Sequence, residues 1–214
     1  MNKLEKFFLF GILGSIPPLV GFLTGWWATS QIFDNWQVFL VAMLGLTAGL
    51  VVTARYIWGW VVNAYQINLA AWMVIHFFYA ICVFGFFMGV PVFNIALAVP
   101  AGFFIACWLP HQRLGLEQER KIIFNTQCFT TGVLALICVT SAWLALRDST
   151  TAANLEGMLR LNFEVTQPMI VTLILVGGAG LLAINWWLTS ITIQLTTRWK
   201  QKTNRRVAGA PSSV

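Results

Sequence analysis

The chain has 214 residues, of which 58% are hydrophobic and only 9% are charged. A water-soluble domain of this length could not bury so much apolar surface, so the composition excludes an ordinary soluble fold and predicts a membrane protein surrounded by lipids. The formal net charge of +6 does not call for a nucleic-acid partner, because basic residues beside apolar runs ordinarily set membrane topology and attract anionic headgroups.

Six apolar runs are long enough to cross about 30 Å of hydrocarbon at a rise of about 1.5 Å per residue. The sequence therefore predicts an all-α, polytopic integral membrane protein, a bundle of six transmembrane helices. We expect residues 1–197 to form this transmembrane domain and the basic residues 198–214 to form a disordered cytoplasmic tail. The predicted spans are residues 7–27, 36–56, 70–89, 93–109, 122–146 and 168–188.

Basic residues divide unevenly between the two sides of this six-span arrangement. Arg147 and Arg160 fall on one side, and the other eleven of the 13 Lys and Arg residues fall on the opposite side. Because cytoplasmic loops are enriched in Lys and Arg, we expect both termini in the cytoplasm and residues 149–166 outside. This topology predicts a multi-pass protein of the plasma (cytoplasmic) membrane, an inner membrane.

The first run contains a proline pair among several glycines. Pro17 and Pro18 lack backbone N–H donors, which predicts a kink and carbonyl groups that neighbouring side chains or water must satisfy. Such a kink can form a binding site. Alternatively, the small residues simply allow another helix backbone to approach closely.

The third run places several aromatic residues and a histidine on one face. Trp72, His76, Tyr79, Val83 and Phe86 are separated by four, three, four and three residues, which is helical spacing. This face could bind a cation or a flat organic molecule by stacking and a directed hydrogen bond. The alternative is that the aromatic rings pack against other helices and the imidazole donates to a backbone carbonyl.

Loop 110–121 is the longest cytoplasmic connection in this arrangement. It carries Glu117 and Glu119 among basic residues. Two carboxylates separated by two residues do not face each other on a helix, so the sequence gives little support for general acid–base chemistry here. The loop could dock a soluble protein partner, or it could be a solvated charged turn.

The last run combines a glycine segment with a polar stripe. Residues 177–180 read Gly-Gly-Ala-Gly and are expected to lie against another backbone. Asn185, Thr189, Thr192 and Thr196 follow at spacings of four, three and four, in the cytoplasmic half that also contains the histidine of the third run. These polar side chains could line one pocket, or they could bond to one another and seal the bundle.

No motif indicates a cofactor, a metal site or an established type of catalytic centre. His76 and His111 would lie at different depths and could not share a haem iron. The sequence has no nucleophile elbow, phosphate loop or HExxH motif, which leaves His76 as a lone catalytic candidate. The cysteines lack metal-ligand spacing and lie in apolar runs, so we expect reduced, structural thiols: Cys82, Cys107, Cys128 and Cys138.

Two classes of function remain. We expect a membrane protein that handles a small solute, as a small transporter or the substrate-binding membrane subunit of one, through an uncharged aromatic and polar pocket. In this pocket His76 and Asn185 should approach one another. The alternative is a non-catalytic accessory or scaffold subunit that docks onto a larger membrane assembly. The candidate ligand-binding residues are Trp72, His76, Tyr79, Asn185 and Thr189.

Overall fold

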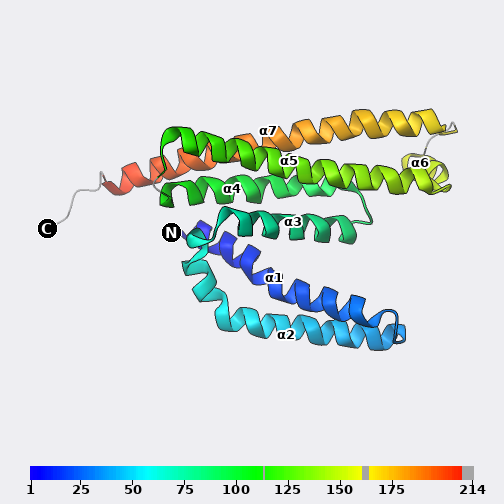
Figure 1. Cartoon of the computed structure of the whole chain (residues 1–214), viewed down its shortest axis with the longest axis horizontal. Helices are drawn as coiled ribbons and strands as arrows, with labels where there is room; N and C mark the ends of the chain where they lie inside the picture. Colours follow the sequence, from blue (N-terminus) through cyan, green and yellow to red (C-terminus); the bar gives the residue numbers. More distant parts are fainter. Residues whose placement is uncertain (113, 161–163, 209–214) are drawn as a thin grey trace. The chain divides into compact units, whose positions relative to one another are not determined.

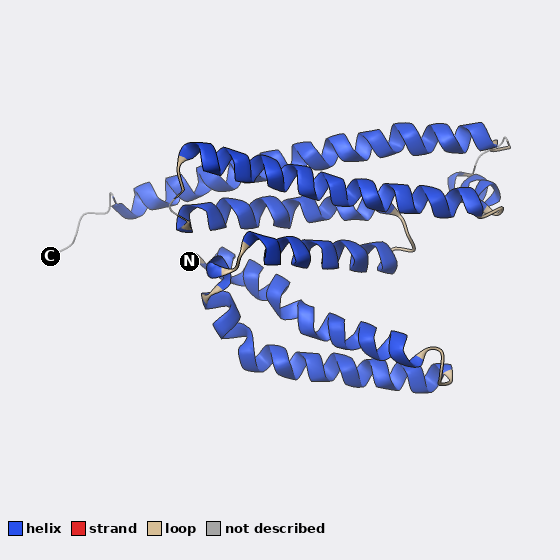
Figure 2. Ribbon diagram, viewed as in Figure 1, coloured by secondary structure: helices blue, strands red, loops and turns tan. Residues whose placement is uncertain are grey.

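A computed structural model describes residues 1–112, 114–160 and 164–208 of the chain. These residues form helices and no strand, which confirms the all-α prediction (Figure 2). Among them, six helical segments are long and apolar enough to cross a membrane. The helices form two compact units, Met1–Ile67 (unit 1) and Asn68–Val214 (unit 2).

Unit 1 is a helical hairpin of α1 (Lys3–Thr29) and α2 (Asn35–Val62), followed by the short 3₁₀ helix η1 (Ala64–Gln66) (Figure 1). Glycines bring the two long helices into backbone contact. A Cβ atom added at Gly21 would lie 2.1 Å from the carbonyl oxygen of Gly45, and the reverse distance is the same. No other residue type fits this crossing without moving the backbones apart, so small residues allow the close approach of α1 and α2.

The proline pair of α1 lies at the same interface. A Cβ atom added at Gly49 of α2 would lie 2.4 Å from the carbonyl oxygen of Pro17. Because Pro18 has no backbone N–H, the carbonyl of Gly14 loses the donor that a regular α-helix supplies four residues later. The hydroxyl of Thr53 on α2 donates to this carbonyl at 2.8 Å. The prediction that a neighbouring group satisfies a freed carbonyl is confirmed.

Unit 2 contains the remaining helices. The fourth predicted span, residues 93–109, is not one continuous α-helix, because its first turns form the 3₁₀ helix η2. The predicted disordered tail is wrong for residues 198–208, which continue α7 as helix, and residues 209–214 lie outside the described residues. The elements are α3 (Leu69–Phe86), η2 (Pro91–Leu97), α4 (Ala98–Trp108), η3 (Leu109–His111), α5 (Leu116–Arg147), α6 (Thr151–Leu159) and α7 (Gln167–Ala208).

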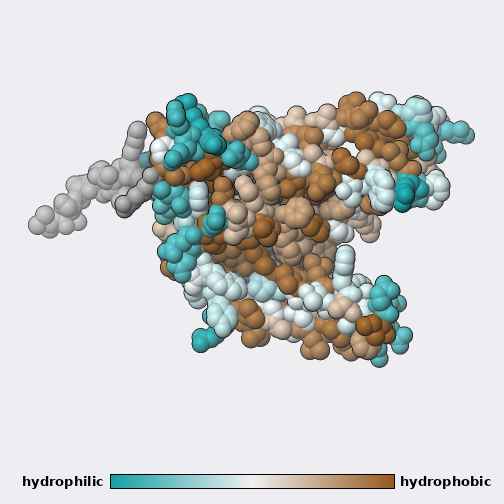
Figure 3. Space-filling view, in the orientation of Figure 1, coloured by the Kyte–Doolittle hydropathy of each residue, from teal (hydrophilic) through white to brown (hydrophobic). Residues whose placement is uncertain are grey.

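Helix α4 is the most buried of the long apolar segments, and it packs against α5 and α7 (Figure 1). Its residues 104–108 are all buried, which means that the helix is covered on every side. Figure 3 shows hydrophilic residues gathered at the two ends of unit 2 and mainly apolar residues between them. This distribution suits helices that cross a hydrocarbon layer, with α4 as the centre of the unit.

Candidate functional site

Polar side chains join α5 and α7 inside unit 2. Asn185 of α7 donates through Nδ2 to the hydroxyl oxygen of Thr131 on α5 at 3.3 Å. Gln127, one turn earlier on α5, donates through Nε2 to the hydroxyl oxygen of Ser190 on α7. Residues four apart share a helix face, so both bonds belong to one interface. We call these four residues the polar seam.

Thr189 lies beside the polar seam but faces α4. Its hydroxyl donates to the carbonyl oxygen of Asn185 at 2.9 Å, within α7. A Cβ atom added at Gly102 of α4 would lie 2.9 Å from the carbonyl oxygen of Thr189. The two helices therefore meet backbone to backbone at this point, and the hydroxyl of Thr189 is used inside its own helix.

Neighbouring rings contact three residues of the predicted aromatic face of α3. The ring of Trp72 stacks on Phe104 of α4, with centroids 3.7 Å apart and planes 10° apart. The imidazole of His76 meets the ring of Phe129 on α5 edge-on at 5.9 Å. Tyr79 meets Phe78 of its own helix edge-on at 5.6 Å. Trp72 and His76 thus contact rings of other helices, as in the alternative for the aromatic face, whereas the ring contact of Tyr79 lies within α3.

Helices α4 and α5 separate the five candidate residues. Residues two apart on an α-helix point about 200° apart, because each residue turns the chain by about 100°. Phe104 and Gly102 on α4 are two apart, so Trp72 and Thr189 contact opposite sides of α4.

The same spacing recurs on α5, where Phe129 and Thr131 are also two apart. His76 and Asn185 therefore contact opposite sides of α5. The predicted approach of His76 to Asn185 is wrong for this reason. Of the five candidates, Asn185 and Thr189 are joined within α7, whereas Trp72, His76 and Tyr79 lie together on α3. A ligand-binding role for any of the five stays a prediction.

Sequence reasoning missed several of the polar residues that the fold brings together. Gln127, Thr131 and Ser190 each lie in a short polar stretch within an apolar run, beside Thr126, Thr130 and Thr189, and such stretches are the signal that could have identified them. The first span was placed from Phe7, whereas α1 begins at Lys3 and includes the buried carboxylate of Glu5.

Glu5 has a partner far away in the sequence. The hydroxyl of Tyr65 donates to Oε2 of Glu5 at 3.1 Å, and both residues belong to unit 1. No spacing rule links residues sixty positions apart. Only the hairpin, which returns the chain to the start of α1, brings this pair together.

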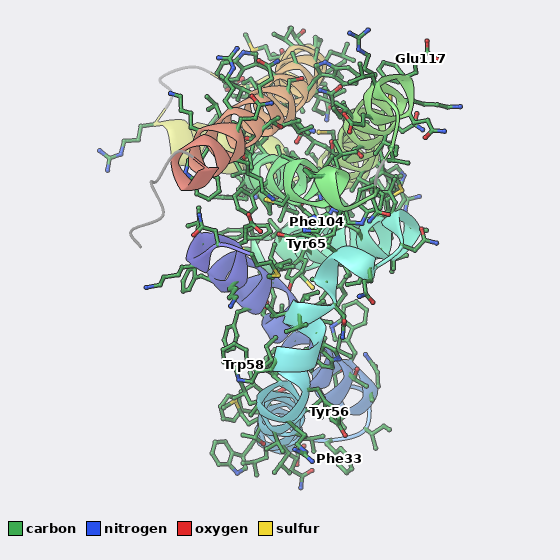
Figure 4. All side chains as sticks on the ribbon, turned by 90° about the vertical axis from the view of Figure 1, so that its left-hand side faces the viewer. Phe33, Tyr56, Trp58, Tyr65, Phe104 and Glu117 are labelled. Carbon is green, nitrogen blue, oxygen red and sulfur yellow. The ribbon has the colours of Figure 1, made fainter. Side chains whose placement is uncertain are left out.

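The predicted docking loop, residues 110–121, is partly helical. Helix α5 begins at Leu116, so Glu117 and Glu119 lie in its first turn. Carboxylates at this position stabilise a helix through its macrodipole. Figure 4 shows Glu117 pointing away from the surrounding helices. The two carboxylates thus have a structural reason for their position, and a docking role for the loop stays a prediction.

The glycine segment of α7 does not lie against another described part of this chain. Cβ atoms added at Gly177, Gly178 and Gly180 would meet no described atom within 4 Å, so the described chain does not supply the expected backbone partner. Helical spacing places Gly180 on a continuous exposed face, which we call the open face of α7. It comprises Leu173, Val176, Gly180, Ile184 and Trp187.

Neither a metal site among the described residues nor a related protein indicates the function. Across residues 1–112, 114–160 and 164–208, no group of three or more His, Cys, Asp or Glu side chains is arranged to hold a metal ion. The four cysteines are free. Comparisons with models of protein families, with curated proteins and with solved structures found no match. The function must therefore be inferred from the geometry.

Proposed function

We propose that the protein is a non-catalytic accessory subunit of a larger membrane assembly. The observation that carries the proposal is the uncovered backbone of α7 at Gly180, on its open face. The partner is a membrane-spanning helix of a different polypeptide, which lies across the open face of α7.

The proposed topology has six membrane-crossing helices and both termini in the cytoplasm. Arg147 and Arg160 would be exterior, and the other basic residues would be cytoplasmic. Helix α7 has 42 residues. At about 1.5 Å per residue its length is about 63 Å, twice a hydrocarbon layer of about 30 Å. Its basic final turns would therefore project into the cytoplasm.

The hairpin of unit 1 is an example, within this chain, of glycines that allow two helices to pack closely. At Gly21 and Gly45 the chain brings two helix backbones into contact by omitting side chains on both. Helices in a membrane associate through such close packing, because the hydrophobic effect does not favour contact between two helices that are already surrounded by lipid. The open face of α7 presents the same kind of small surface beside the apolar side chains of Ile184 and Trp187.

The polar interior of unit 2 supports a structural role. Asn185 bonds to Thr131, and Gln127 bonds to Ser190, so these side chains join α5 to α7. They do not converge with the aromatic face of α3 on one pocket. Solute handling, the first function expected from the sequence, stays a prediction, and a small molecule retained in native mass spectrometry would favour it.

Site-specific photo-crosslinking tests the proposed partner. A benzophenone amino acid at Ile184, on the open face, should crosslink the chain in native membranes to a second, different polypeptide. The same probe at Val139 of α5, which is 66% exposed, is the control and should not. A product of unchanged mass, from lipid or from crosslinking within the chain, or a product of twice the chain mass would contradict the proposal.

A matched pair of substitutions tests the role of the glycines. Gly180→Leu should abolish co-purification of the partner in mild detergent, because a side chain would hold the two backbones apart. Gly132→Leu on α5 makes the same chemical change at another glycine whose added Cβ would meet no described atom within 4 Å. It should leave the partner bound, and equal loss in both variants would argue against a specific role for α7.

A further inference from the structure

Asn94 is a buried amide without a partner. It lies in η2, and its side chain is only 4% exposed. Both Nδ2 and Oδ1 are inaccessible and form no hydrogen bond with any described residue. An amide can donate two hydrogen bonds and accept two, so this side chain leaves its whole bonding capacity unused.

The helical path is broken where Asn94 occurs. Helix α3 ends at Phe86, and the turn that follows has positive φ angles at Met88 and Gly89. The chain then forms seven residues of 3₁₀ helix before α4 begins. Runs of 3₁₀ helix longer than three or four residues are uncommon. In membrane proteins, such interrupted helices commonly accompany binding sites.

The register of η2 directs Asn94 toward the interface of α3 and α5. A 3₁₀ helix has three residues per turn, so Asn94 and Leu97 share one face. Leu97 packs against a buried cluster formed by Ala80 of α3 and by Val133 and Ile137 of α5. Asn94 therefore lies one turn from this cluster, on the side nearer the turn between α3 and η2.

An amide in this position needs a partner. Burial of an amide in apolar surroundings without a hydrogen bond is strongly unfavourable, and buried polar groups in folded proteins are almost always bonded. We propose that Asn94 binds a small, uncharged molecule that both donates and accepts hydrogen bonds. The molecule is either water or a solute of the same chemistry. The proposal is independent of the accessory role of the open face of α7.

A matched pair of leucine variants tests whether the amide is bonded. Asn185 is equally buried and bonds to Thr131, so Asn185→Leu should lower the melting temperature. If Asn94 holds a molecule, Asn94→Leu should lower the melting temperature as well. If Asn94 has no partner, the same change removes an unfavourable group and should raise it. A higher melting temperature for Asn94→Leu than for the wild-type protein would overturn the proposal.

A high-resolution map of the full chain in lipid nanodiscs, prepared in solute-free buffer, provides the second measurement. Density that does not belong to protein should lie within hydrogen-bond distance of Nδ2 or Oδ1 of Asn94. An additional mass in native mass spectrometry, absent from Asn94→Leu, identifies a retained solute. Density without that mass identifies water. A map in which Asn94 contacts only protein groups would overturn the proposal whichever way the melting temperature moves.

Discussion

The hydroxyl of Thr53 on α2 donates to the carbonyl oxygen of Gly14 on α1 at 2.8 Å, where Pro18 has removed the usual helical donor. The methyl carbon of Thr53 is also close, 3.3 Å from a Cβ atom added at Gly14. One side chain thus replaces a missing backbone bond and fills the space beside the glycine. Pro18 of α1 removes a backbone donor, and Thr53 of α2 supplies the donor that replaces it.

Thr53→Val should destabilise the protein by about 1–3 kcal/mol, because the carbonyl of Gly14 would be left buried without a donor. Thr53→Ser keeps the hydroxyl and should cost less. In a Pro18→Ala background, the restored backbone N–H can bond to Gly14, so Thr53→Val should then have a smaller effect. Unfolding in mixed detergent and dodecyl sulfate micelles measures this double-mutant cycle. Equal effects of Thr53→Val in both backgrounds would disprove the coupling.

Gly21→Ala should separate α1 from α2, because its Cβ atom would lie 2.1 Å from the carbonyl oxygen of Gly45. Overpacking of this kind costs about 1–3 kcal/mol. Gly11→Ala is the control, since a Cβ atom there meets no described atom within 4 Å. Thermal unfolding should show a large loss for the first variant and little change for the second. Similar values for both would refute the proposed close crossing.

The bond between Asn185 and Thr131 should be measurable as a coupling. A double-mutant cycle combines Asn185→Ala, Thr131→Val and the variant with both changes. The interaction energy should be about 0.6 kcal/mol and no more than about 1.7 kcal/mol. His76 lies on the opposite side of α5, so a cycle between His76→Phe and Asn185→Ala should give no coupling. Coupling of His76 with Asn185 would restore the shared pocket predicted from the sequence.

His76→Phe should leave the protein folded and should not weaken binding of the proposed partner. Phenylalanine keeps a ring of similar shape against Phe129, so the edge-on contact at 5.9 Å can be retained. Circular dichroism and co-purification in mild detergent measure the two properties. Loss of a retained small molecule from an otherwise folded variant would show instead that the imidazole binds a ligand.

The start of α6 should weaken in acid. The backbone N–H of Thr150 and then its hydroxyl donate to Asp148, and these bonds hold the pKa of the Asp148 carboxyl below its ordinary value of 3.8. The stabilising effect is therefore present above that value and is lost as the pH falls through the lowered pKa. The protection factors of the α6 amides, which correct for the intrinsic pH dependence of exchange, should fall over this range. Asp148→Ala should show fast exchange at neutral pH as well.

Composition and apolar run length were sufficient to predict an all-helical chain with six segments of membrane-crossing length, because each such run must bond its own backbone to remain in lipid. The proline pair was also sufficient to predict a carbonyl in need of a donor. That the donor is Thr53, from a different helix, could not be read from α1 alone. The position of Thr53 depends on where Gly45 and Gly49 allow α2 to cross α1.

The candidate pocket shows where sequence reasoning reaches its limit. Helical spacing placed Asn185 and Thr189 on related faces, and run boundaries placed His76 at a similar depth. Depth and face do not determine which neighbour a helix meets. Phe129 and Thr131 lie on opposite sides of α5 by spacing alone, but only the tertiary structure shows that His76 contacts the first and Asn185 the second. The lateral order of helices depends on packing among residues distant in the chain, and apolar runs of nearly equal hydropathy leave that order unspecified.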